Sequence, residues 1–187
     1  MIKTLLLIYI LMAAFIVKAQ TSDKVNPAEF DEALLYKLYK SKCDSLRQSK
    51  KLNALLPDSI LYKAALMHAN YLVLKNAEGH FENSNINRTP FDRVINLGGG
   101  DFEVVGENQL TTYLFQPIIF FYEKKEIPHT LTGYAETAQH LFDMFRFSSH
   151  HYENLVNKSF THCAAAIIYN PTNKSLKMVE VFGSKQK

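Results

Sequence analysis

Two histidines and one glutamate, placed in three separate segments, have the side chains needed to bind a divalent cation. His80 lies in a polar loop, Glu107 is the centre of a Gly-Glu-Asn tripeptide, and His151 lies in the stretch FRFSSHHYENL, residues 145–155. Two neutral imidazoles can bind Zn²⁺ and leave positions open for water or a ligand. A neighbouring carboxylate can orient one imidazole, or act as the base when a metal-bound water attacks a substrate.

Three interpretations of these residues follow, and the sequence leaves all three open. In the first, His80, Glu107 and His151 form a buried hydrogen-bonded network that holds loops around a cleft. In the second, the two histidines bind a metal ion weakly and reversibly. In the third, the metal supports hydrolysis with Glu107 as the base, although catalytic zinc sites generally use three protein ligands. His150 can replace His151 in each case.

Helical segments position these residues. Asn26-Pro27-Ala28-Glu29 has the pattern of a helix start, with a capping residue, a proline and a glutamate in favourable places. Pro57-Asp58 opens a second helix, which carries His68 on its apolar side. We expect His68 to be a hydrogen-bonded core histidine rather than a metal ligand. Ala135–Phe147 is amphipathic and predicts a third helix, with the paired histidines at its end.

The clear strands come late in the chain. Residues 102–110 predict a short strand, and residues 160–169 and 176–182 predict a hairpin. Helices first and strands later favour an α+β fold in one domain. The apolar stretch Tyr113–Tyr122 contains Pro117, so a helix, an edge strand and a flap all remain open. Core packing is the commoner role of such a stretch, whereas exposure would let it bind a partner or lipid.

The N-terminus has the pattern of a signal peptide. Lys3 precedes an apolar run that ends at Val17, and Ala19 offers a small residue at a cleavage site. The run is shorter than the ~20 residues of a membrane-spanning helix. We therefore expect residues 1–19 to be removed and residues 20–187 to form a secreted or periplasmic domain without a stable membrane span. Loss of Lys3 and Lys18 lowers the formal net charge from +3 to +1, which argues against nucleic acid as a partner.

The chain contains two cysteines, Cys43 and Cys163, and an even pair in an exported protein is a disulfide candidate. A bridge would close a loop of 163 − 43 = 120 residues. On the chain-entropy account such a bridge stabilises the fold by about 5 kcal/mol. Two buried free thiols are the alternative, and the sequence does not choose between them.

Taken in order, these segments resemble the CAP superfamily of cysteine-rich secretory, antigen 5 and pathogenesis-related proteins, and look most like its bacterial, SCP-like branch. The similarity extends from about Leu35 to Gly183. The matching residues are Leu56, Asp58, Ala64-Ala65, His68-Ala69, His80, Arg93, Gly98, Gly106-Glu107-Asn108, Phe145, Ser148, His151, Asn154, Leu155 and Phe182-Gly183. No single motif is specific, but seven in order make coincidence improbable.

The chain also departs from the family pattern near the histidines. Phe145 replaces the usual tryptophan, and Ser149-His150 replaces a usual Pro-Gly pair. Ser148 stands where many eukaryotic members have a second glutamate. The family's set of two histidines and two glutamates is therefore one carboxylate short.

The resemblance implies a three-layer α-β-α sandwich around a central, largely antiparallel sheet, with a core of about residues 28–183. It implies an exported module that binds an extracellular protein, a peptide or a lipid, with zinc or another divalent cation as the only candidate cofactor. The site residues would be His80, Glu107, Asn108, Ser148, His151 and Asn154, with His80 and His151 as the metal ligands. The alternatives are a metal-assisted, peptidase-like hydrolase with Glu107 as the catalytic base, and a lipid- or sterol-binding protein that uses Tyr113–Tyr122.

Overall fold

The computed structural model describes residues 23–122 and 125–185, so the predicted signal peptide, residues 1–19, lies outside the described part of the chain. In chain order the elements are α2 (Glu32–Ser49), β1 (Leu56–Pro57), α3 (Ser59–Lys75), α4 (Pro90–Asn96), β2 (Phe102–Tyr113), β3 (Pro117–Tyr122), β4 (Lys125–Thr130), α5 (Tyr134–Phe147), α6 (Ser149–Leu155), β5 (His162–Asn170) and β6 (Ser175–Lys185).

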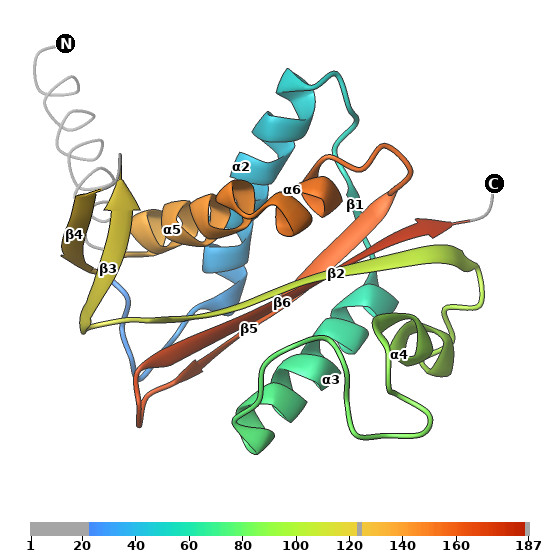
Figure 1. Ribbon diagram of the computed structural model, residues 1–187, viewed down its shortest axis with the longest axis horizontal. Coiled ribbons are helices and arrows are strands. Elements are labelled where there is room, and N and C mark those ends of the chain that lie inside the picture. Colours follow the sequence, from blue (N-terminus) through green and yellow to red (C-terminus); the bar gives the residue numbers. More distant parts are fainter. Residues whose placement is uncertain (1–22, 123–124, 186–187) are drawn as a thin grey trace, which may run out of the picture.

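Four of these strands form the central sheet, in the order β1-β5-β6-β2. Strand β6 pairs antiparallel with both β5 and β2, and the short β1 pairs parallel with β5. Figure 1 shows α2, α5 and α6 on one side of this sheet and α3 and α4 on the other. The predicted α+β, three-layer arrangement is confirmed, with the C-terminal hairpin of β5 and β6 at its centre.

The side chains of β6 divide the core into two halves. Leu176, Met178 and Phe182 pack with residues of α2 and α5, whereas Val179 and Val181 pack with residues of α3. Successive side chains of a strand point to opposite faces, and helices cover both faces here. For this reason β6 is buried along nearly its whole length. Both halves are mainly apolar, so the buried polar side chains among them need a physical explanation.

The first helix begins later than the sequence predicted. Asp31 caps α2, because its carboxylate accepts a hydrogen bond of 2.9 Å from the Leu34 N–H. Asn26 closes a separate turn, in which its side-chain oxygen accepts from Ala28 N–H and its carbonyl accepts from Glu29 N–H. The predicted start at Asn26 is therefore wrong. Asn and Asp both serve as helix caps and as turn residues, so local sequence does not distinguish the two roles.

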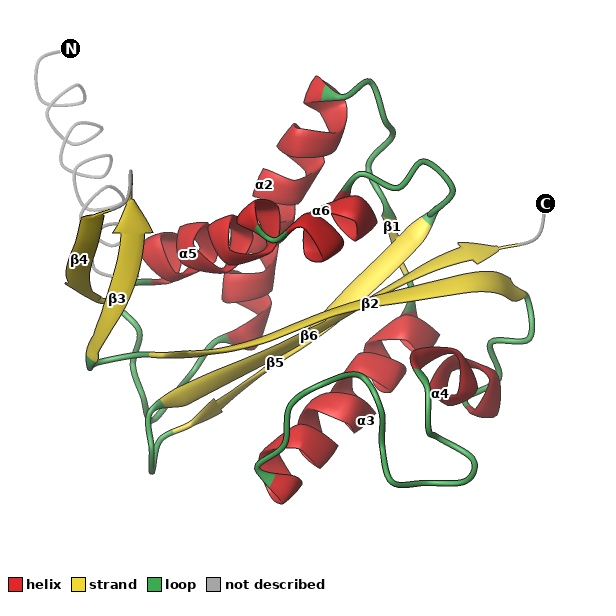
Figure 2. Cartoon of the chain, in the orientation of Figure 1, coloured by secondary structure: helices red, strands yellow, loops and turns green. Residues whose placement is uncertain are grey.

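The sequence predicted that the paired histidines lie at the end of one helix, and this prediction is wrong. Helix α5 ends at Phe147, Ser148 has an extended backbone (φ −89°, ψ 120°), and α6 begins at Ser149. The chain changes direction at this break, as Figure 2 shows. His151 is therefore carried by a separate short helix, which contacts the edge strand β2.

The apolar stretch Tyr113–Tyr122 divides between two sheets. Tyr113 ends β2, and Pro117 begins β3, which pairs antiparallel with β4 as a two-stranded sheet apart from the main one. Of the three alternatives that the sequence left open, the structure has the edge strand. Ile119 and Ile127 are exposed on this hairpin. None of the helices in the described ranges has both the length and the apolar character to cross a bilayer.

Candidate functional site

The Gly-Glu-Asn tripeptide lies on β2, the edge strand, and faces both helical layers. Glu107 and Asn108 are neighbours in the strand, so their side chains point to opposite faces of the sheet. Glu107 is paired with Val181 and shares its face with α3, whereas Asn108 is paired with Glu180 on the other face. The sheet edge therefore joins residues from α3 and α4 to residues from α6.

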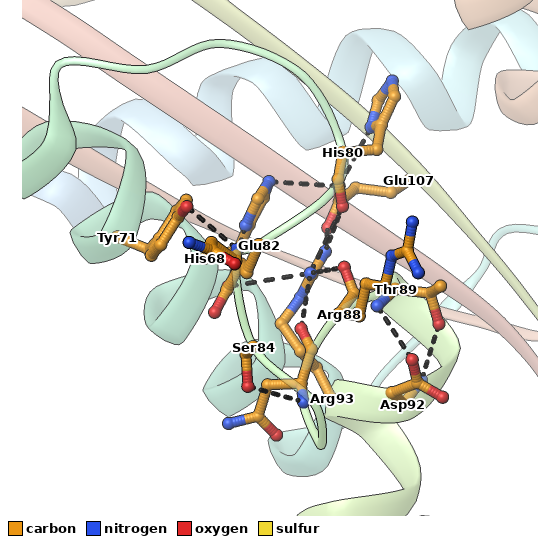
Figure 3. Close-up of polar contacts among 12 residues, drawn as sticks. His68, Tyr71, His80, Glu82, Ser84, Arg88, Thr89, Asp92, Arg93 and Glu107 are labelled. Carbon is orange, nitrogen blue, oxygen red and sulfur yellow. Dashed lines mark hydrogen bonds and ion pairs between the residues drawn. The ribbon is translucent and has the colours of Figure 1, made fainter.

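The carboxylate of Glu107 is fully engaged by cationic and hydrogen-bonding partners, which Figure 3 shows. Its Oε2 accepts a hydrogen bond of 2.6 Å from Arg93 Nη2, and its Oε1 lies 2.9 Å from His80 Nδ1. His68 Nε2 lies 3.5 Å from the same Oε1. The Glu107 side chain is only 1% exposed. A buried carboxylate with such partners is held as an anion in one orientation.

Arg93 provides the largest compensating charge for this carboxylate. It lies on α4, whose start is set by Pro90 in the first turn and by a capping box between Thr89 and Asp92. The Arg93 side chain is completely buried, and its guanidinium also donates to the backbone carbonyl of His80 at 3.3 Å. The helix therefore fixes the guanidinium, and the guanidinium fixes both Glu107 and the loop that carries His80.

His68 and Glu82 form a second buried pair beside Arg93. His68 Nδ1 lies 2.9 Å from Glu82 Oε1, and His68 Nε2 lies 2.9 Å from the carbonyl oxygen of Gly79. Both ring nitrogens of His68 therefore face hydrogen-bond acceptors. Arg93 also lies 3.6 Å from Glu82, and we call Arg93, His68, Glu82 and Glu107 the buried charged base. The prediction of a hydrogen-bonded core histidine is confirmed for His68.

His80 is held by the carboxylate of Glu107, whereas His151 lies on α6 close enough for His80 to influence its pKa. The His80 side chain is 40% exposed, and because Nδ1 is bonded to Glu107, its Nε2 remains for a ligand. His151 is half-buried, and its ring packs edge-on against that of Phe145 at 5.0 Å. Burial, followed by the neighbouring His80 and His150, lowers the pKa of His151, which favours a neutral imidazole. We call His80 and His151 the two-histidine site; His150 is exposed.

Asn108 and Asn154, predicted as ligand-facing residues, bond to each other and to the backbone. Asn154 Nδ2 donates to Asn108 Oδ1 at 2.8 Å, and Asn108 Nδ2 donates to the carbonyl of His151 at 3.0 Å. A Cβ at Gly106 would lie 2.7 Å from Cζ of Phe160 and 3.0 Å from Asn154 Oδ1, so a larger residue there would force these side chains to shift. The two amides thus hold α6, and with it His151, against the edge strand. Ser148 lies at the junction of α5 and α6.

The two-histidine site does not fit a catalytic zinc ion. Within residues 23–122 and 125–185 no group of three or more His, Cys, Asp or Glu side chains is placed to hold a metal ion. His80 and His151 can supply two nitrogen ligands, one fewer than catalytic zinc sites generally have. Glu107 is committed to Arg93 and His80, so it does not supply the third.

The sequence does not indicate the role of Arg93 or of the His68–Glu82 pair. Arg93 stands at a position that matches the family pattern, but nothing in a short helix beside Val94 indicates that a guanidinium is completely buried. Cys43 and Cys163 are buried free thiols in this structure, and their pairing as a disulfide stays a prediction. Both cysteines pack in the core half that contains α2 and α5.

Comparison with known proteins decides the family. The sequence model of the cysteine-rich secretory protein (CAP) family matches residues 41–182, which is most of the chain. The chain belongs to the CAP family. The match includes every residue of the buried charged base and the two-histidine site. A sequence comparison with curated proteins found no significant match.

Solved structures show the same fold in distant bacterial proteins. An outer surface protein from Borrelia burgdorferi superposes with a TM-score of 0.64 at 18% identity, over 84% of this chain and 97% of that one. An extracellular protein containing a SCP domain, from Bacillus anthracis, superposes with a TM-score of 0.55 at 19% identity. That match covers 80% of this CAP chain and 40% of the other. At such identities the similarity concerns the fold alone.

Proposed function

We propose that this CAP protein is an exported binding module, which takes a peptide or small ligand at the two-histidine site without turning it over. Export is supported by the signal-peptide pattern of residues 1–19 and by fold relatives described as outer surface and extracellular proteins. Family membership supports a domain that serves many roles on one fold, so the site must carry the rest of the argument.

The commitment of Glu107 to its buried partners carries the proposal. A general base must reach the proton that it abstracts, directly or through one water. The Glu107 side chain is 1% exposed, and both of its oxygens are bonded, to Arg93 and His80. Turning toward a substrate would leave the buried Arg93 without its closest anion, which is strongly unfavourable. This arrangement supports binding rather than hydrolysis with Glu107 as the base.

The chemistry that remains available is that of two imidazoles on a rigid support. The bond of His80 to Glu107 uses Nδ1, so Nε2 is available to a ligand. His151 adds a second imidazole, whose pKa is lowered by burial. Such groups can exchange hydrogen bonds with a peptide backbone or a small polar ligand. A divalent cation bound by His80 and His151 would supply further positions for ligand oxygens, and two protein ligands favour weak, reversible binding.

Calorimetric titration of the purified protein with Zn²⁺ near neutral pH tests the site. We expect weak one-site binding that is lost in His80→Ala and in His151→Ala. His150→Ala is the matched control, because it removes an exposed imidazole one residue away. No binding in the unsubstituted protein, with lower thermal stability of both variants, would make the histidines a purely structural network.

Proteolysis assays test the absence of turnover. Zinc-loaded protein is incubated with casein, with and without a chelator, beside Glu107→Gln. We expect no cleavage that depends on the metal. Chelator-sensitive cleavage that disappears in Glu107→Gln would support the hydrolase alternative instead.

Lipid binding by the β3–β4 hairpin is the second candidate function. The exposed Ile119 and Ile127 favour it, together with an apolar groove of about 330 Å³ between this hairpin and α5, lined in part by Ile127 and Leu131. Co-sedimentation with neutral liposomes, compared between the unsubstituted protein and Ile119→Ser/Ile127→Ser, tests this alternative. Retention with liposomes that the double variant abolishes would support it.

A further inference from the structure

A pocket of about 460 Å³, which neither His80 nor His151 lines, lies where the end of α2 meets the loops before β1 and before β5. It is lined by Arg47, Lys51, Leu52, Asn53, Ala54, Leu56, Lys158, Phe160 and Thr161. Three of these side chains are cationic, and among the described residues that line the pocket none is acidic. The pocket shares no residue with the buried charged base described above.

Arg47 is the buried member of this cationic group, and it is only 3% exposed. Its Nε donates to the carbonyl of Asn53 at 2.8 Å, and its Nη1 donates to the carbonyls of Leu155 and Asn157, each at 3.0 Å. Nη2 donates to no other residue in the described ranges. Three carbonyls therefore hold the guanidinium of this lining residue rigidly, and they leave its Nη2 amino group without an acceptor in the described ranges. Burial lowers the pKa of Arg47, although an arginine remains charged at neutral pH.

Lys51 and Lys158 add two positive charges at the mouth of the pocket, and both are exposed. Lys51 has φ +59°, a left-handed backbone that a residue with a side chain rarely adopts. Of the acidic residues nearby, Asp44 influences Arg47, but it forms its own ion pair of 2.5 Å with Lys40. A purely structural arginine explains the three carbonyl bonds. It does not explain why two lysines line the same pocket without a carboxylate among them.

The lining also has an apolar side. Leu56 is 59% exposed, and the buried Phe160 and the half-buried Leu52 lie beside it. A guanidinium with a spare donor and two ammonium groups match a tetrahedral oxyanion with two negative charges better than a monoanion. An exposed leucine beside them matches an organic group attached to that oxyanion.

We propose that this pocket binds a phosphate monoester, with the oxyanion against Arg47, Lys51 and Lys158 and the organic group against Leu56. The proposal is independent of the function proposed for the two-histidine site. Free inorganic phosphate has the same oxyanion without the organic group. Comparing the two ligands therefore separates the contribution of the cationic residues from that of Leu56.

Titrations followed by ¹H–¹⁵N spectra of the purified protein test the proposal. Inorganic phosphate and phenyl phosphate are added at constant ionic strength, and the amide signals of Asn53, Ala54 and Lys158 are followed. We expect saturable shifts with both ions and tighter binding of phenyl phosphate, because its ring removes apolar surface from water. Binding should weaken as salt is added. No saturable shift of these amides at millimolar concentrations would overturn the proposal.

The variant Lys51→Asn/Lys158→Gln removes two charges while keeping the fold, because asparagine tolerates the left-handed backbone at position 51. We expect roughly tenfold weaker binding of both ions. The control is Lys63→Gln/Lys75→Gln, which removes two exposed charges outside the pocket. Equal losses in the two variants would show a general charge effect and overturn the site. Leu56→Ala should remove only the advantage of phenyl phosphate, and an unchanged advantage would overturn the place assigned to the organic group.

Discussion

Glu107 and Glu180 are buried carboxylates on opposite faces of one sheet, and their surroundings differ in charge. Glu107 faces α3 and α4, where Arg93, His80 and His68 lie within 2.6–3.5 Å of its oxygens. Glu180 faces α2, where the hydroxyl of Tyr39 donates to its Oε2 at 2.6 Å. Burial raises the pKa of Glu180 from its ordinary 4.5 to about 7, against the opposing effects of Tyr39 and Lys40.

The comparison shows two ways of placing a carboxylate in a protein core. In the first, a buried guanidinium pairs with the carboxylate, and two imidazoles lie beside it. In the second, a neutral hydroxyl is the close partner, and the group retains its proton up to a higher pH. The carboxylate with the guanidinium partner is the one bonded to His80, so this arrangement orients the His80 ring.

Replacement of Arg93, the guanidinium that pairs with Glu107, should have the largest effect on stability. Arg93→Met leaves Glu107 and Glu82 buried without their guanidinium partner, and we expect a loss of about 3–5 kcal/mol in the free energy of unfolding. Urea denaturation monitored by circular dichroism measures this loss. Arg88→Met is the control, because Arg88 is exposed on the adjoining loop. A loss as small as that of the control would contradict the account of the buried charged base.

Neutralisation of Glu180 should instead increase the free energy of unfolding. The folded-state pKa of Glu180 is raised, so its protonated form contributes stability below pH 4.5 and this contribution is lost as the pH rises through about 7. The glutamine of Glu180→Gln carries no charge at any of these pH values, so the variant does not lose this stability as the pH rises. Its amide oxygen can still accept the hydrogen bond from Tyr39. We expect little change near pH 4.5 and a gain on the order of 3 kcal/mol above pH 7.

The measurement for Glu180→Gln is urea denaturation at several pH values between 4.5 and 8. Glu103→Gln, at an exposed position of β2, is the control for the loss of one charge. A stability difference that does not change with pH would refute the assignment of a raised pKa to Glu180.

Removal of the exposed histidine should cost little stability. His80→Ala breaks the bond to Glu107, but the His80 side chain is 40% exposed and Arg93 remains to compensate the carboxylate. We expect a change of about 1 kcal/mol or less, typical of an exposed pair. The same denaturation assay checks this value. A loss as large as that of Arg93→Met would show that His80 is part of the buried charged base rather than a group presented to ligands.

The thiols of Cys43 and Cys163, which lie near Glu180, should react slowly in the native protein. Burial raises the pKa of Cys163 to about 12 and that of Cys43 well above its usual range, so few thiolates are present at pH 8. We expect iodoacetamide to label them slowly in the native protein and rapidly in urea, as mass spectrometry would show. Rapid native labelling would contradict their burial. Failure to label in urea until a reductant is added would show the predicted disulfide.

Much of the layer arrangement could be predicted because its signals are local and repeated. Ala135–Phe147 has an apolar face at helical spacing, and α5 covers this range and begins one residue earlier, at Tyr134. The hairpin of β5 and β6 was likewise visible as two apolar runs separated by turn residues. The starts and breaks of helices were not predictable, because Asn26 and Asp31 have similar capping ability. The hydrogen bond from Asp31 N–H to the Tyr134 hydroxyl at 2.7 Å is a tertiary contact that the local sequence does not reveal.

The amino-acid pattern was enough to indicate the family, the layer arrangement and the grouping of His80, Glu107 and His151. Their roles were decided by the tertiary structure. A linear pattern records which side chains are present, whereas the state of a carboxylate depends on which charges surround it after folding. The same sheet therefore holds Glu107 as a compensated anion and Glu180 as a group with a raised pKa, a difference that the residue type alone does not contain.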